Sequence, residues 1–387
     1  MTDGLAETAE PQAPKRKATP AAPTPAAAEP KAAKRAAAEA EAPRPKGARI
    51  RAVAKRLTVP TLIVVPILAF LLSLTLGRYD VSLGELFTLF GSKLGLTDAT
   101  VSEEVSTVIL NVRLPRIFAA LLIGAGLALS GGAYQGMFRN PLVSADILGA
   151  SAGAGFGAAL GIMLSKSVLA TQLLAVFFGL AAVLITYTLA GRLRRGDPTL
   201  FLVLTGILVG TVFTSLISIL KVLADPYDKL PAITFWLMGS LAAINRQDIL
   251  ILLGPIVVGG AALLAVRWHL NPLSFGEEEA RAMGSETGKL RAIVIGACTL
   301  MTASAVAIAG IIGWVGLIIP HLARGIVGPN YGKLLPVSAV IGAVYLLLVD
   351  DIARMAGPLE MPLGILTALI GAPFFIFLLA RTRRAWT

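Results

Sequence analysis

Charge, histidine and cysteine are all scarce in this sequence. Charged residues make up 15% of the 387 residues and hydrophobic residues 56%, whereas soluble domains carry about 25% charged residues. This balance excludes an ordinary soluble domain and indicates an integral membrane protein. The only two histidines, His269 and His321, lie too far apart in sequence to suggest a metal site, so no metal and no cofactor is predicted. The single cysteine, Cys298, excludes an internal disulfide.

Ionisable side chains are also nearly missing from the long apolar runs. Asp146, Asp350 and Asp351 lie near the ends of such runs, and no Glu, Lys, Arg or His holds a clear central position. A proton-driven carrier needs a titrating group inside the membrane to relay the proton, so the sequence weighs against that class. Sodium binding by backbone carbonyls at broken helices needs no such group and stays open.

The apolar runs themselves predict an all-α polytopic membrane protein with about ten transmembrane helices. Most runs approach the roughly 20 residues that cross the hydrocarbon core. The predicted spans are about 57–77, 115–135, 145–163, 168–190, 199–220, 248–266, 291–312, a short one near 314–324, 335–353 and 362–380.

Residues 1–56 differ in composition from the transmembrane domain of residues 57–387. They are rich in Ala, Pro and Lys and nearly free of large apolar residues, which predicts a disordered tail. This tail holds twelve Lys/Arg and six Asp/Glu, about half of the net charge of +11. Ten spans place both termini on one side, and the basic tail makes that side the cytosol of a bacterial inner membrane. The arginines at 192, 194, 195, 381, 383 and 384 agree. We therefore assign the positive charge to contacts with membrane lipid and predict no nucleic-acid partner.

Glycines recur every four positions in the third predicted span, at Gly149, Gly153, Gly157 and Gly161. Small residues at this spacing let a neighbouring helix approach closely. We interpret the stripe as helix packing; a ligand-binding role is the less favoured alternative.

The most heavily charged interval of the apolar part is residues 267–291. Ser274 and Glu277 form an S-x-x-E capping box, which predicts the start of a short helix, and Gly284 supplies its stop. Acidic residues suit the positive end of a helix dipole and a basic residue suits the other end. The charged residues of this predicted helix are Glu277, Glu278, Glu279 and Arg281. We predict a compact helix outside the bilayer between two spans; an ordinary solvated loop is the alternative.

No motif for ATP hydrolysis is found. Residues 284–290 resemble a phosphate-binding loop only faintly, because the spacing is one residue short and Leu290 replaces the magnesium-binding hydroxyl. The chain is therefore not predicted to be an enzyme.

Several ordered motifs resemble the FecCD-type permease subunits of ABC importers for iron–siderophores, haem and cobalamin. The likeness covers roughly residues 57–380, and the basic tail lies outside it. The motifs are RLPR at 113–116, GAGLALSGGAYQGMFRNPLVSADILGASAGAGFG from Gly124, GEEEARAMG at 276–284, GWVGLIIPHLARG at 313–325, LLPVSAVIGA at 334–343 and PLGILTALIGAPFF at 362–375.

This resemblance implies a type II ABC importer permease fold of ten helices that pairs with a second copy or a close paralogue. Two cytosolic ATPase subunits, which carry the ATP and magnesium, would dock below. An extracytoplasmic substrate-binding protein would dock above. The segment from Gly276 to Gly284 matches the family's coupling helix, which rests on the ATPase.

The resemblance also implies roles for a few single residues. Arg113, Arg116 and Arg354 match the external arginines that receive acidic residues of the binding protein; anchoring to lipid headgroups is the alternative. Thr199 matches a polar position of the cytosolic gate, although Pro198 departs from the hydroxyl expected beside it.

Two other functions compete with an ATP-driven importer. One is a secondary transporter of a small solute, which would work without an ATPase and need a coupling ion. The other is a membrane scaffold or sensor, for which so many glycines offer little reason. For the importer, an iron chelate is the expected substrate, a siderophore first and haem or cobalamin next.

Overall fold

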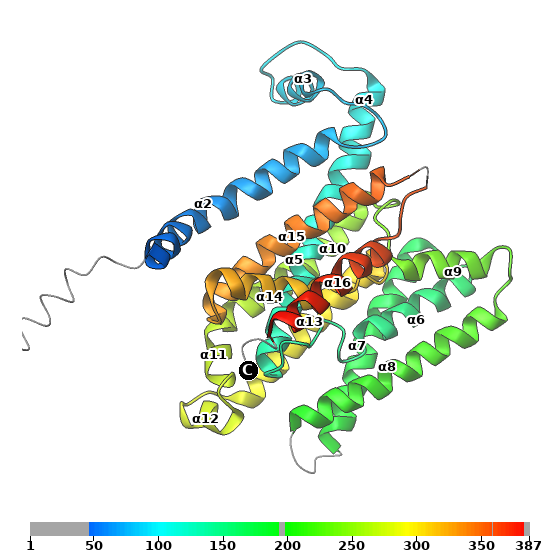
Figure 1. Ribbon diagram of the computed structural model, residues 1–387. Coiled ribbons are helices and arrows are strands. Elements are labelled where there is room, and N and C mark those ends of the chain that lie inside the picture. Colours follow the sequence, from blue (N-terminus) through cyan, green and yellow to red (C-terminus); the bar gives the residue numbers. More distant parts are fainter. Residues whose placement is uncertain (1–45, 193–197, 358, 383–387) are drawn as a thin grey trace, which may run out of the picture. The chain divides into compact units, whose positions relative to one another are not determined.

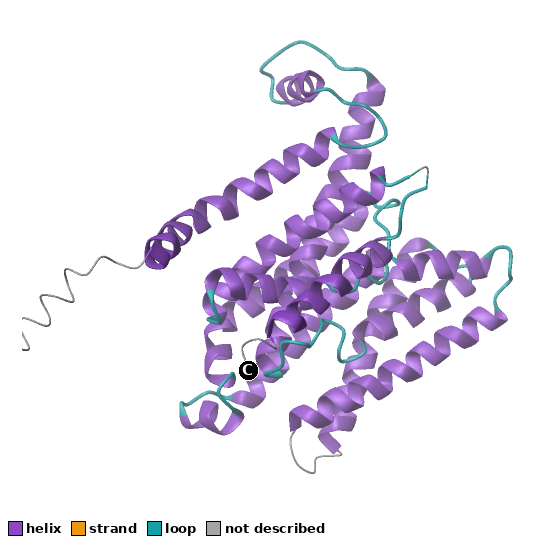
Figure 2. Ribbon diagram, in the orientation of Figure 1, coloured by secondary structure: helices purple, strands orange, loops and turns teal. Residues whose placement is uncertain are grey.

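The computed structural model describes residues 46–192, 198–357 and 359–382 (Figure 1). These residues form helices joined by loops, with no strand among them (Figure 2). The chain divides into two compact units, residues 1–57 and 58–387, and the second unit carries the features described below. Most of the predicted tail and the arginines at 194, 195, 383 and 384 lie outside the described residues. Helix α2 begins at Lys46, within the predicted tail.

The helices confirm a polytopic architecture with about ten spans. Six described helices are long and apolar enough to cross a membrane, and four shorter apolar segments accompany them. The corresponding helices are α2 (Lys46–Thr75), α5 (Leu114–Met137), α6 (Ala150–Met163), α7 (Val168–Arg192), α8 (Pro198–Leu223), α10 (Arg246–Val266), α13 (Thr287–Ala309), α14 (Val315–Val327), α15 (Tyr331–Met355) and α16 (Leu363–Thr382).

Short helices occupy several of the connections. Only one of them, in the charged interval, is predicted by the sequence. They are α3 (Leu83–Lys93), α4 (Glu103–Thr107), the π-helical η2 (Val108–Arg113), α9 (Lys229–Met238), the 3-10 turn η3 (Arg267–His269), α11 (Leu270–Leu273) and α12 (Glu277–Ala282). On α3, Ser82 and Glu85 complete a capping box, and hydrogen bonds from the Ser82 backbone and hydroxyl lower the pKa of Glu85.

Helix α5 is the centre of the second unit. It packs against α10, α13, α14 and α15 (Figure 1). The most apolar stretch of its continuous helix is 78% buried, against 33% for α8. A Cβ atom on Gly124 would lie 2.2 Å from the carbonyl oxygen of Gly342 on α15. Glycine therefore permits a backbone contact that any side chain would block.

The glycine stripe packs α6 against α7 at three of its four positions. A Cβ atom would lie 2.4 Å from the Phe178 carbonyl oxygen at Gly153 and 2.2 Å from that of Leu174 at Gly157. Gly161 likewise faces Thr171 of α7. Gly149 is different, because it precedes α6 with a φ of 86° and packs against α8. The predicted span from 145 therefore starts too early, since residues before 150 form turns.

Replacing Gly157 with alanine tests this packing. We expect Gly157→Ala to lower the free energy of unfolding by roughly 1–3 kcal/mol, because the methyl group overlaps the α7 backbone. The measurement is the melting temperature of the purified protein in detergent. Gly254→Ala on α10 is the matched control, because a Cβ atom there meets nothing within 4 Å. Equal melting temperatures for the two variants would contradict the packing role.

Candidate functional site

The predicted charged helix exists as α12, but its cap differs from the prediction. The Ser274 hydroxyl donates to the Asn271 carbonyl oxygen at 2.6 Å instead of accepting from α12. The residue before the helix is Gly276, with a φ of 146°, and a Cβ atom there would lie 1.9 Å from a carboxylate oxygen of Glu279. The Ser274 capping box is therefore wrong: Gly276 precedes the helix, in a backbone conformation that residues with a side chain rarely adopt.

Gly284 ends α12 as predicted. Its φ is 80°, and its N–H donates to the Arg281 carbonyl oxygen at 2.9 Å. The N–H of Ser285 donates to the Ala280 carbonyl oxygen, also at 2.9 Å. A glycine in the left-handed region with these closing bonds is a common helix terminus.

The three glutamates of α12 face different surroundings. Glu278 and Glu279 are exposed, as is Arg281. Glu277 is turned inward, with its side chain 20% exposed, and accepts from Arg281 Nη2 at 2.6 Å and from Arg291 Nη2 at 2.7 Å. The exposed charged residues of α12 are therefore Glu278, Glu279 and Arg281; contact with an ATPase stays a prediction.

Thr199 lies beside this network. Its hydroxyl oxygen accepts from Arg291 Nη2 at 3.0 Å. The Thr287 hydroxyl donates to Glu277 at 3.3 Å. The sequence motifs included Thr199 and Glu277 but gave no role to Arg291, which closes the charged interval 267–291 and begins the predicted span 291–312. The gate role of Thr199 is not tested by this geometry and stays a prediction.

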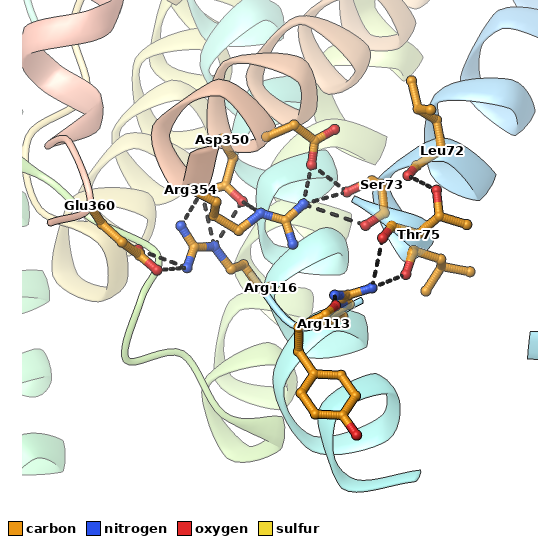
Figure 3. Close-up of polar contacts among 11 residues, drawn as sticks. Leu72, Ser73, Thr75, Arg113, Arg116, Asp350, Arg354 and Glu360 are labelled. Carbon is orange, nitrogen blue, oxygen red and sulfur yellow. Dashed lines mark hydrogen bonds and ion pairs between the residues drawn. The ribbon is translucent and has the colours of Figure 1, made fainter. Parts of the chain in front are cut away.

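The three predicted docking arginines lie in a second cluster, on η2, α5 and α15 (Figure 3). Arg116 makes a two-pronged contact with Asp350: its Nε lies 2.8 Å and its Nη2 2.9 Å from the two carboxylate oxygens. Its remaining nitrogen donates to Glu360 at 3.0 Å. This geometry is the strongest form of an arginine–carboxylate pair.

Arg354 completes the cluster on α15 and reaches α2. It pairs with Asp351 one turn earlier and donates to the Ser73 hydroxyl at 2.9 Å. The Ser73 hydroxyl in turn donates to Asp351 at 2.7 Å. Asp350 and Asp351 are 0% and 2% exposed. The cluster therefore ties α2, α5, α15 and the loop before α16 together.

Arg113 caps the end of α2. Its guanidinium donates to the carbonyl oxygens of Leu74, Thr75 and Tyr79, with the Thr75 contact at 3.1 Å. Positive charge at a helix C-terminus offsets the unpaired carbonyl groups there. Arg113 is therefore a structural cap.

All three arginines are buried; docking of the binding protein and anchoring to lipid headgroups both stay predictions. Arg113, Arg116 and Arg354 are 3%, 4% and 6% exposed, and the last two are already paired with carboxylates. An incoming acidic residue or a lipid headgroup would have to displace these internal partners. The two acidic residues just before Arg354 could have suggested an internal ion pair. No sequence pattern, however, shows which arginine they contact.

A polar groove lies along α8, and sequence reasoning missed it. Four exposed hydroxyl residues follow one face of this otherwise apolar helix at the spacing i, i+3, i+4, i+7. Each hydroxyl donates to a carbonyl of its own helix at 2.9–3.0 Å, which leaves oxygen lone pairs free. The groove, about 430 Å³ in volume, also includes Ser144 and Asp146. Its hydroxyl residues are Thr211, Thr214, Ser215 and Ser218.

Replacing one carboxylate of the buried cluster tests its contribution to stability. We expect Asp350→Leu to destabilise the protein by about 3–5 kcal/mol, because Arg116 keeps a buried charge without its main partner. Adding Arg116→Leu should restore most of the loss, because the isolated charge is gone. The measurement is the melting temperature in detergent.

The matched control is Asp228→Asn, which removes an exposed carboxylate that lies 3.5 Å from Lys229 and is expected to cost about 1 kcal/mol or less. An Asp350→Leu effect no larger than that of the control would show that the cluster does not hold the helices together.

Comparison of this chain with known proteins identifies its family. Residues 64–381 match the model of the FecCD transport family. The chain is 41% identical over 318 residues to the molybdate import system permease protein of Haemophilus influenzae, covering 82% of this chain and 94% of that protein. It is 34% identical over 337 residues to the ferric enterobactin transport system permease protein of Escherichia coli, covering 86% and 98%.

A solved structure agrees with these sequence relatives. It is assigned to the metal-chelate type of ABC transporter, in an inward-facing conformation, and superposes with a TM-score of 0.75 at 40% identity. The match covers 83% of this chain and 97% of that one. With its helical architecture shared over nearly the whole length of these proteins, the chain belongs to the FecCD transport family and is an ABC importer permease.

Proposed function

We propose that this chain imports an iron chelate, with a siderophore as the first candidate and haem or cobalamin next. A second copy would complete the pathway. The hydroxyl groove on α8 carries the proposal. Exposed hydroxyl groups on a helix of mean hydropathy 2.4 gain nothing from lipid, so we infer that they face a watery path at the axis between two copies. Hydroxyl groups suit a polar chelate that passes through without tight binding.

The energy source in this proposal lies outside the chain. On α12, Glu278, Glu279 and Arg281 are exposed. We assign this exposed charged surface to contact with a cytosolic ATPase subunit. The termini and α12 then lie on the cytosolic side of the inner membrane, and an extracytoplasmic binding protein delivers the substrate to the opposite side.

A second substrate is molybdate. The 41% identity to a molybdate permease, over 94% of that protein, favours it. Molybdate is a compact oxyanion that accepts hydrogen bonds, and a hydroxyl of the α8 groove donates to it only by releasing the carbonyl of its own helix. The importer mechanism is the same for both substrates. The alternative of a secondary transporter has no specific observation in its favour.

A competition experiment separates the two substrates. The permease is reconstituted in proteoliposomes with its ATPase subunits and binding protein, and uptake of a ⁵⁵Fe-siderophore is measured with unlabelled molybdate in excess. We expect ATP-dependent uptake of the iron chelate that molybdate does not reduce. Uptake of ⁹⁹Mo-molybdate, without uptake of any iron chelate, haem or cobalamin, would overturn the iron-chelate proposal and favour the oxyanion.

Reversing the exposed charges of α12 tests the ATPase contact. We expect the double variant Glu278→Arg, Glu279→Arg to weaken ATPase binding by at least tenfold, because like charges replace complementary ones at an interface. The measurement is the dissociation constant of the ATPase subunit in detergent at several salt concentrations. The matched control is Glu103→Arg, Glu104→Arg on α4, which reverses two exposed charges elsewhere. Equal affinities for the two double variants would rule out α12 as the contact.

A further inference from the structure

Arg291 joins α12 and α13, which follow one another in the sequence, to the distant α8. It stands on α13 and is 9% exposed. Its Nη2 atom donates to Glu277 of α12 at 2.7 Å and to the Thr199 hydroxyl of α8 at 3.0 Å. A guanidinium nitrogen of this kind carries two hydrogens, so both bonds form at once. The side chain therefore bridges α12 and the first turn of α8.

Glu277 holds the other end of this bridge at several points. One carboxylate oxygen accepts from Arg291, and the other accepts from Arg281 at 2.6 Å and from Thr287 at 3.3 Å. Arg281 also donates to the Thr287 hydroxyl at 3.1 Å. Bonds to charged groups with little exposure are stronger and more directional than exposed ones. Helix α12 is therefore fastened to the start of α13 by its side chains.

The backbone alone would not fasten α12 in this way. Residues 283–286 connect α12 to α13, and Gly284 among them has a φ of 80° with nothing within 4 Å of a Cβ atom. Thr199 lies 92 positions from Arg291 along the chain. A displacement of α12 therefore reaches the first turn of α8 through side-chain contacts, and Glu277, Arg291 and Thr199 provide a continuous path of them.

We propose that Glu277, Arg291 and Thr199 form a mechanical relay that passes movement of α12 to the start of α8, the helix that carries the hydroxyl groove. This inference rests on the proposed function, in which the ATPase moves α12. Glu277 is then a positioning residue of the permease and no part of the surface that contacts the ATPase. The relay also gives Thr199 a specific role, because its hydroxyl oxygen is the point at which Arg291 holds α8.

The alternative is that the three residues only stabilise the fold. A structural staple would affect the amount and melting temperature of the protein, whereas a relay sets how much substrate is imported per ATP hydrolysed. The ratio of ATP hydrolysed to substrate imported therefore separates the two, because a merely less stable complex loses both activities together.

The test replaces Thr199 in the full complex, reconstituted with ATPase subunits and binding protein. Thr199→Val removes the hydroxyl while keeping the shape, and Thr199→Ser keeps the hydroxyl. We expect T199V to raise the ratio of ATP hydrolysed to substrate imported by about tenfold, the effect of losing a hydrogen bond to a charged group. T199S should stay within about twofold of the wild type, because its oxygen still accepts from Arg291. Thr188→Val is the matched control, since that exposed hydroxyl bonds only within α7.

If T199V also lowers the stability of the protein, a double-mutant cycle between Glu277 and Thr199 still tests the relay. If Glu277 and Thr199 act through one relay, the ratio in the double variant Glu277→Gln, Thr199→Val will match that of the worse single variant. Multiplied effects, or equal ratios for T199V and T199S, would overturn the relay while leaving the importer intact. A wild-type complex that imports nothing with ATP would overturn the proposed function, and the relay with it.

Discussion

A charged side chain that is buried away from water needs a partner of opposite charge within the protein. The pairing of Arg116 with Asp350 is the strongest example of this requirement in the structure. An isolated charge in a membrane helix costs several kcal/mol. The two-pronged contact at 2.8 and 2.9 Å gives each group a partner of opposite charge, although Arg116 is 4% and Asp350 0% exposed. Because the partners stand on α5 and α15, the pair also sets how these helices meet. Their backbones then touch at Gly124 and Gly342.

The low polarity of the membrane also explains which parts of the structure the sequence predicts. Apolar runs of nearly membrane length identify the spans, because hydrocarbon requires them, and the four-residue glycine spacing identifies the α6–α7 contact. Helix α12 follows from its local charge pattern, although its first residue depends on a glycine that local rules did not single out. Arg116 and Asp350 are 234 positions apart in the sequence, and no periodic sequence pattern predicts a contact over that separation. The arginines therefore looked like an exposed surface when they are a buried cluster.

The stripe of hydroxyl residues on α8 could have been predicted from the sequence, but the sequence analysis did not identify it. Thr211, Thr214, Ser215 and Ser218 share one helical face, yet hydropathy alone counts them as mild interruptions of a span. Arg291 was out of reach, because its role depends on two partners from other helices. Polar groups on this permease thus fall into two kinds. Some hold helices together, and others stay exposed along one face of α8 with hydrogen bonds only to carbonyls of that helix.

These two kinds of polar group suit an importer that spends no energy of its own. The buried cluster makes α2, α5 and α15 one rigid part, while α12 and α8 meet through a few side chains that a partner could move. The most direct test of this account is uphill uptake by vesicles that contain the purified chain alone, compared with vesicles that also contain the ATPase subunits, the binding protein and ATP. The account predicts accumulation of the chelate only in the second case. Accumulation by the chain alone, driven by an ion gradient, would contradict it.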